Sequence, residues 1–320
     1  MIVTQRPAVT RRRLLFGLGA AGLSLGAPPS LSPAFAWSAQ RPKGTVSALA
    51  FDQGNLVLAA DGIWISSDGG MSFSSRSEGP GAAVAALATH VALSGVIYAA
   101  TPKGLQRSED AGLSWHPAGS GLPASPVDAV AIAAHDPQTI YAAVRGDGLW
   151  QSRDGAKSWD FAMDRPLIGK VERDVVSLVS VGITSGMGGI WVFAGTEAGM
   201  AKVPDCFCRW SELGNGAAMS TLASGQKTID VVAKKRLPSE HVRNIALAPS
   251  APKVLFAALP SGIWKTQDTG ETWGLLSAAL ASHCLAVDPN DPDHIVAADA
   301  GGTMLVSRDG GVTWAAPTAL

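Results

Sequence analysis

Tyrosine, cysteine and charged side chains are all scarce in this chain of 320 residues. It contains two tyrosines, three cysteines and 16 % charged residues, against 47 % hydrophobic residues. So little charge combined with so many apolar side chains excludes a disordered chain and predicts a globular one with a sizeable core. Tryptophan, with ten copies, is the aromatic residue used most.

A long hydrophobic run is missing as well. The N-terminal run covers 14 residues, from Leu14 to Ala27, which is too short to span a bilayer comfortably. Three arginines precede it and Ala34-Phe35-Ala36 follows it. This order predicts a signal peptide over 1–36, and Arg11–Arg13 resemble a twin-arginine export motif. An ordinary secretory signal or an uncleaved anchor is the alternative.

The chain also lacks an excess of positive charge. Of its 25 basic residues four lie in 1–36, which has no acidic residue, so 21 basic and 26 acidic residues remain in 37–320. This balance argues against a general binder of nucleic acid or of anionic membranes. We therefore expect an exported periplasmic or extracellular protein that is not an integral membrane protein.

An octet repeats six times along the chain, at 66–73, 108–115, 152–159, 203–210, 266–273 and 307–314. It reads SSDGGMSF, SEDAGLSW, SRDGAKSW, VPDCFCRW, TQDTGETW and SRDGGVTW. Its aspartates are separated by 42, 44, 51, 63 and 41 residues, so one unit recurs with insertions around the fourth copy. We assign structural roles to its aspartates and tryptophans: Asp68, Asp110, Asp154, Asp205, Asp268, Asp309, Trp115, Trp159, Trp210, Trp273 and Trp314.

The chemistry of the octet is that of a tight turn. The aspartate can accept hydrogen bonds from backbone N–H groups ahead of it, and a glycine two places later can take the left-handed conformation. The Ser or Thr hydroxyl adds a second bond to the backbone, and the aromatic residue can bury a large area between neighbouring units.

Short apolar stretches and turn residues surround each octet. In 127–162 they predict three strands before the octet and one after it, and five other units follow the same plan. Four-stranded antiparallel sheets repeated in this way are the blades of a β-propeller. We predict an all-β, six-bladed propeller over 37–320, with an insertion at 216–240. Strands hidden in that insertion would make seven blades, although 25 residues are few for a blade.

The octet resembles the Asp-box, or BNR, repeat, and five copies fit its pattern well. The fourth copy keeps only Asp205 and Trp210. A single exported propeller with these repeats is similar to the photosystem II stability and assembly factors and to sortilin-type propellers. The first of these resemblances implies a membrane-protein partner bound through one face with an arginine patch. Candidate partner-binding residues here are Arg145, Arg173, Lys234, Lys235, Arg236 and Arg243; the last four can equally be a solvated loop.

Asp-box propellers also include sialidases and other glycoside hydrolases. A sialidase needs a tyrosine nucleophile and three converging arginines, yet Tyr98 and Tyr141 lie in equivalent IYAA strands, where packing explains them. We therefore expect a non-catalytic scaffold or assembly factor for a membrane-associated complex, with no cofactor. The alternative is a carbohydrate-active propeller that uses loop acids on one face: Asp61, Asp147, Asp174, Glu197 and Asp299.

The spacing of the three cysteines matches no recognised metal-binding motif, and we name no metal ligand. Cys206 and Cys208 fall in the degraded fourth octet, whereas Cys284 lies on a predicted inner strand, so the expected distance argues against a bridge between these places. A local Cys206–Cys208 bridge, free thiols, or a soft metal bound with Asp205 all stay open, although no second ligand pair lies nearby in the sequence.

Overall fold

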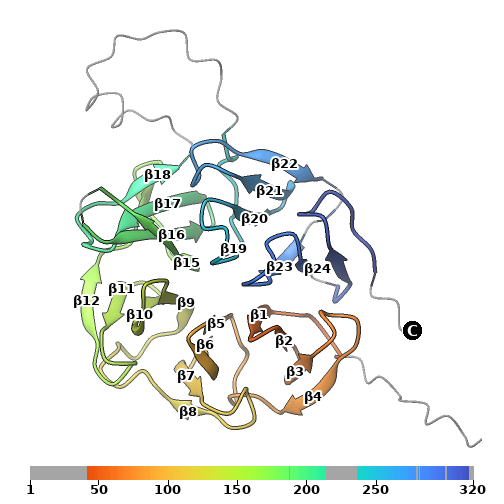
Figure 1. The fold of residues 1–320 in the computed structure, drawn as a ribbon. Coiled ribbons are helices and arrows are strands. Elements are labelled where there is room, and N and C mark those ends of the chain that lie inside the picture. The colour runs from red at the N-terminus through yellow and green to blue at the C-terminus, as the bar shows by residue number, and fades with distance from the viewer. Residues whose placement is uncertain are drawn as a thin grey trace, which may run out of the picture. The chain divides into compact units, whose positions relative to one another are not determined.

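Six antiparallel sheets follow one another around a central axis in the computed structural model (Figure 1). The model describes residues 42–316 except 187, 214–235, 279, 281 and 300, and these residues lie in one compact unit, Ala39–Leu320. The predicted all-β, six-bladed propeller is confirmed. The predicted signal peptide at 1–36 and most of the insertion at 216–240 lie outside the described residues.

Each blade uses one continuous stretch of chain, and its strands run in order from the axis outwards. Blade one contains β1 (Ala48–Asp52), β2 (Asn55–Ala59), β3 (Ile63–Ser66) and β4 (Ser74–Ser77). Blades two and three have the same order, with β5 (Ala86–His90), β6 (Leu93–Thr101), β7 (Gly104–Ser108), β8 (His116–Pro117), then β9 (Val127–Ala133), β10 (Asp136–Val144), β11 (Gly148–Ser152) and β12 (Asp160–Met163).

A small hairpin, β13 (Leu167–Ile168) and β14 (Val171–Glu172), separates blades three and four. Blades four and five contain β15 (Val175–Thr184), β16 (Ile190–Thr196), β17 (Gly199–Pro204), β18 (Ser211–Leu213), then β19 (Asn244–Leu247), β20 (Leu255–Leu259), β21 (Gly262–Thr266) and β22 (Gly274–Ser277).

Blade six differs from the four-stranded prediction. Its described sheet has three strands, β23 (Ser282–Val287), β24 (Ile295–Asp299) and β25 (Met304–Ser307). Only the single bridge between Val306 and Ala315 stands where a fourth strand would lie. The octet at 307–314 ends just before Ala315, so little of the described chain remains to pair with β25.

The core consists of six hydrophobic clusters, one between each pair of neighbouring blades. Every cluster receives the aromatic residue of one octet, as expected: Phe73, Trp115, Trp159, Trp210, Trp273 and Trp314. In each case the ring packs between its own blade and the preceding one. The cluster with Phe73 joins blade one to blade six and closes the ring. The described part of the chain contains no helix with the length and hydropathy that a membrane span needs.

Candidate functional site

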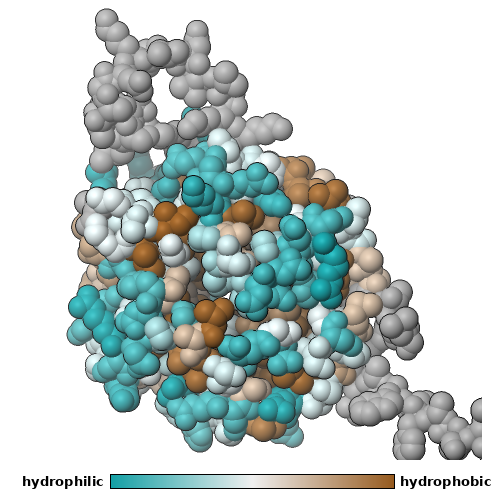
Figure 2. Space-filling model, in the orientation of Figure 1, coloured by the Kyte–Doolittle hydropathy of each residue, from teal (hydrophilic) through white to brown (hydrophobic). Residues whose placement is uncertain are grey.

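The two ends of the propeller carry different loops. We call the end with the second-to-third strand loops and the blade connections the connection face, and the opposite end, with the octet turns, the box face. By this topology Arg145, Arg173 and Arg243 and all five candidate acids lie on the connection face, away from the octets. Hydrophilic residues cover most of the face seen in Figure 2, with smaller hydrophobic groups between them.

The octet aspartates are used inside their own turns. Asp110 Oδ1 accepts hydrogen bonds from Ser108 Oγ at 2.8 Å and from the Ser114 backbone N–H at 2.9 Å, and Asp110 Oδ2 accepts one from Ser114 Oγ at 2.6 Å. The Gly112 N–H donates to Ser108 Oγ at 2.8 Å. Equivalent bonds occur around Asp68, Asp154, Asp268 and Asp309. These donors, Ser114 first, lower the pKa of Asp110 to about 2.

Each octet turn is also bonded by a side chain of the preceding blade. Tyr98 of blade two donates to the Gly155 carbonyl at 3.2 Å, and Lys265 of blade five donates to the Gly310 carbonyl at 3.1 Å. The remaining interfaces use Arg76 on Ala111, Tyr141 on Asp205, Lys202 on Glu271 and His294 on Gly69. The octet turns therefore join each blade to the preceding one.

The fourth octet departs from this pattern. Asp205 Oδ1 accepts the Ile190 N–H at 3.0 Å, and Asp205 Oδ2 lies 3.5 Å from Tyr141 Oη. The carboxylate therefore bonds residues that precede it in the sequence, not the backbone of its own turn. Cys206 and Cys208 form a disulfide across this turn, and Cys284 is a buried free thiol. Of the alternatives for Cys206 and Cys208, the structure thus selects the local bridge. The described residues contain no group of three or more side chains suited to a metal.

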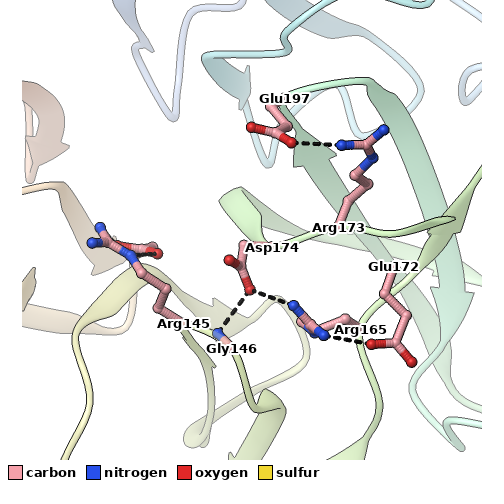
Figure 3. A network of polar contacts seen from close by, with 8 residues as sticks. Arg145, Gly146, Arg165, Glu172, Arg173, Asp174 and Glu197 are labelled. Carbon is pink, nitrogen blue, oxygen red and sulfur yellow. Dashed lines mark hydrogen bonds and ion pairs between the residues drawn. The ribbon is translucent and has the colours of Figure 1, made fainter.

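On the connection face, charged side chains of blades three and four form a set of ion pairs that we call the arginine network (Figure 3). Arg145 donates two hydrogen bonds to Asp128, from Nε to Oδ2 at 2.8 Å and from Nη2 to Oδ1 at 2.6 Å. The Asp128 side chain is 9 % exposed and the Arg145 side chain 57 % exposed. A buried carboxylate therefore holds an exposed guanidinium in one orientation.

The network continues through the β13–β14 hairpin and its flanks. Asp174 Oδ1 accepts the Gly146 N–H at 2.8 Å and lies 3.4 Å from Arg165 Nη1, while Arg165 also pairs with Glu172. Arg173 Nη1 donates to Glu197 Oε1 at 2.7 Å. Two of the sequence candidates, Arg145 and Arg173, thus belong to one network. Sequence reasoning missed Asp128, Arg165 and Glu172, although the charged stretch 164–174 was visible as a signal.

Arg243 lies beside this network in blade five. Burial, and then the charge of Arg243, lowers the pKa of His241 and of His283, and Glu197 acts on His241 in the opposite direction. The segment before Arg243 is anchored because Leu237 and Val242 are buried in the core between blades four and five. A Cβ on Gly195 would lie 2.8 Å from the Val242 carbonyl oxygen, so this close packing requires glycine there. Arg236 is exposed, and Lys234 and Lys235 lie outside the described residues.

The candidate acids have local partners. Asp61 and Asp147 accept the indole N–H of Trp64 and Trp150 at 2.8 and 2.7 Å. Asp299 accepts the Thr303 N–H at 2.8 Å, and Asp174 and Glu197 belong to the arginine network. Their oxygens thus serve to fix loops and to orient arginines.

A cavity of about 290 Å³ occupies the axis, towards the box face. It is lined by all six inner strands, with mainly apolar side chains such as Leu49, Phe51, Ile132 and Val287. Its polar lining includes Thr89 and Ser180, which bond the neighbouring blades at Phe51 O and the Ala134 N–H. These two hydroxyls therefore tie inner strands together.

Solved structures share this fold at low identity. The GH74 xyloglucanase from Xanthomonas campestris matches with a TM-score of 0.56 and 16 % identity, over 87 % of this chain and 55 % of the enzyme. The extracellular domain of BT4673 from B. thetaiotaomicron matches with a TM-score of 0.51 and 12 % identity, over 82 % of this chain and 32 % of that one. YCF48 bound to a D1 peptide gives 0.48 and 16 %, over 86 % and 82 %.

The likenesses to the xyloglucanase and to BT4673 support the propeller fold and nothing finer. The chain spans about half of the xyloglucanase and a third of the BT4673 chain. No protein-family model matches the sequence, and no curated protein matches it.

Proposed function

We propose that this protein is an exported, non-catalytic propeller that binds a protein partner, a component of a membrane-associated complex, through the connection face of blades three to five. The observation that carries the proposal is the Arg145–Asp128 pair. The Arg145 side chain is more than half exposed, yet the buried carboxylate fixes its guanidinium through only two of its donors.

Such an arginine suits recognition of a protein. Its remaining donors can bind carbonyl or carboxylate groups of a partner, and little side-chain entropy is lost because the side chain is already ordered. Arginine is enriched at protein interfaces for these reasons. Arg173 and Arg243 extend the charged surface over neighbouring blades. The polar groups of the octets, in contrast, form hydrogen bonds within the fold and so are not offered to a partner.

The predicted export signal supports the same function. The basic start, short apolar run and Ala-Phe-Ala end of 1–36 are typical of a signal peptide, and we propose that the propeller is exported. The basic residues Lys234 and Lys235 belong to the connection between blades four and five, next to Arg236. We assign them to the same partner-binding surface.

The test is capture of partners by the mature chain from gently crosslinked host cells, with identification by mass spectrometry. We expect one dominant membrane complex with the wild type and a strongly reduced yield with Arg145→Ala/Arg173→Ala. The matched control is Lys157→Ala/Lys253→Ala, which removes two positive charges from exposed residues at box-face loops. Circular dichroism shows whether each variant is folded.

Equal capture by the folded arginine variant and the control would refute this surface. The glycan alternative is tested on the same proteins. Hydrolysis of a polysaccharide that is lost in Asp147→Asn or Asp174→Asn would replace the scaffold with a carbohydrate-active enzyme.

A further inference from the structure

The fourth octet is the one turn in which a disulfide stands in place of the octet hydrogen bonds. In the other five turns, the aspartate binds the backbone N–H four residues later, as Asp154 binds Ser158 at 2.9 Å. Among the described residues, Asp205 instead bonds Ile190 and Tyr141. The turn itself is linked by Cys206–Cys208.

A disulfide of this kind contributes little as a cross-link. It encloses only Phe207, and the stabilisation from constraining the unfolded chain is smallest for the shortest loops. Both cysteines are exposed, so dissolved thiols can reach the sulfur atoms. When the bond is reduced, the two thiols remain neighbours on one short turn and can re-form it. A reactive role for this disulfide therefore explains its presence better than a contribution to the stability of the fold.

The surroundings of Cys206 suit a sulfur that gains and loses negative charge. Cys206 shares an open polar depression between blades three and four with His135 and Arg153. Arg153 Nε donates to Gln151 Oε1 at 3.0 Å, which holds the guanidinium in the depression. A neighbouring cation favours the thiolate over the thiol. The Asp205 carboxylate in the same depression accepts hydrogen bonds from Ile190 and Tyr141, and its negative charge acts against that of Arg153.

We propose that Cys206 and Cys208 form a thiol–disulfide exchange site that oxidises pairs of cysteine thiols in peptides or proteins. This inference goes beyond the partner-binding function: it leaves the connection face non-catalytic and adds a catalytic reaction elsewhere on the propeller. It assigns an activity to the box face, opposite the arginine network.

The exchange balances in two steps. A substrate thiolate attacks Cys206 Sγ, the Cys206–Cys208 bond breaks, and Cys208 leaves as a thiolate. The second substrate thiolate then attacks the substrate sulfur of this mixed disulfide, and Cys206 leaves as a thiolate beside Arg153. The substrate loses two electrons and gains a disulfide, the protein becomes a dithiol, and the two thiol protons pass through water to Cys206 and Cys208. Oxidised glutathione restores the bridge and is released as two thiols.

Cys284 takes no part in this chemistry. It is buried, and burial raises the pKa of its thiol to about 12. Its Sγ lies 3.8 Å from the Val46 carbonyl oxygen, in the cluster between blades one and six. Cys284→Ser therefore serves as a control that removes a thiol without touching the exchange site.

The experiment follows the oxidation of a reduced two-cysteine peptide by oxidised glutathione in the presence of the mature chain. We expect the protein-dependent rate to fall about tenfold or more in Cys206→Ser/Cys208→Ser and to persist in Cys284→Ser. Equal rates with the wild type and the folded double variant would overturn the proposal. So would a bridge that mild thiols reduce only after the protein unfolds, which would make the disulfide structural.

Two further variants keep the test sharp. Folded Cys208→Ser, given oxidised glutathione and a peptide with a single cysteine, should hold the peptide as a mixed disulfide on Cys206, because neither partner has a second thiol to release it; mass spectrometry detects the adduct, and its absence contradicts the mechanism. In the same background Arg153→Gln should raise the pH at which the Cys206 thiolate forms, followed by its ultraviolet absorbance, and Arg153→Lys should restore it. An unchanged titration would remove Arg153 from the site.

Discussion

At the scale of single residues, the octet aspartates make the fold sensitive to acid. Their hydrogen bonds, led by those from Thr313 and Ser114, lower the pKa of Asp309 and of Asp110 to about 2, against an ordinary 3.8. A carboxyl whose pKa is lower in the folded state stabilises the fold above its unfolded value. That stability is lost as the pH falls from about 4 towards 2.

We expect the melting temperature of Asp309→Asn to decrease less than that of the wild type as the pH falls over this range. The reason is that the variant no longer has the carboxylate that must be protonated. Thermal unfolding between pH 2 and 6 measures it. Glu78→Gln is the control, since Glu78 is exposed and lies outside the octets. A slope identical to the wild type in Asp309→Asn contradicts the prediction.

Thr269 carries local backbone strain. Its φ is +60°, in the left-handed region that β-branched residues avoid, while the equivalent residue in three other octets is Gly69, Gly155 or Gly310. Thr269→Gly should raise the free energy of unfolding by about 1 kcal/mol, because the steric cost disappears. Urea unfolding tests it. The reverse change, Gly310→Thr, should destabilise, since a Cβ there would lie 2.7 Å from Asp293 Oδ1.

At the scale of elements, the inter-blade side chains decide how firmly neighbouring blades are joined. Tyr98 and Tyr141 occupy equivalent strands, but their hydroxyl groups reach different acceptors, at 3.2 Å for the Gly155 carbonyl and at 3.5 Å for Asp205. Tyr98→Phe should cost about 1 kcal/mol of stability, as expected for one buried hydrogen bond. Tyr141→Phe should cost less, and chemical denaturation of the two variants compares them. A larger loss in Tyr141→Phe would reverse this ranking of the two acceptors.

The elements themselves could largely be predicted from the sequence. Octet spacing and apolar stretches located the blades, because turn residues and strand periodicity act over a few neighbouring residues. The partners of the arginines could not be found in this way. Arg145 and Asp128 are 17 residues apart, and their pairing follows from the register of β9 and β10.

Two details of blades four and six also escaped sequence reasoning. Cys206 and Cys208 left three alternatives open because a short turn can hold thiols, a bridge or a metal. The sequence predicts a complete outer strand for blade six, yet the described residues, which end at 316, show only the bridge at Ala315. In both places the outcome depends on local geometry that composition does not specify.

At the scale of the whole molecule, the contact between blades one and six differs from the other five. Blades that follow one another in the sequence are joined by the chain, whereas blades one and six are not consecutive, so their contact, which we call the seam, depends on noncovalent contacts among the described residues. It consists of the cluster around Leu58, Phe73 and Cys284, together with the His294 contact to Gly69. Because no short stretch of chain links blade six to blade one, the two blades can separate at the seam without being held together covalently.

The seam should therefore open before the other interfaces. Leu58 and Leu105 are both fully buried, in the seam and between blades two and three respectively. Changing either residue to alanine should lower stability by about 2–5 kcal/mol. Hydrogen exchange should then speed up selectively in β1–β3 and β23–β25 for Leu58→Ala, through local opening. A uniform increase over all blades in both variants would show that the ring opens only as a unit.

The continuity of each blade has a consequence for how such a chain can change over generations. Since no described blade shares strands with another, duplicating or deleting one coding segment adds or removes a finished sheet together with its octet. Each new sheet would bring its own aromatic wedge for the neighbour before it. The number of blades can then change by one at a time. A degenerate octet such as the fourth can acquire a new function, because the other five octets still join their blades.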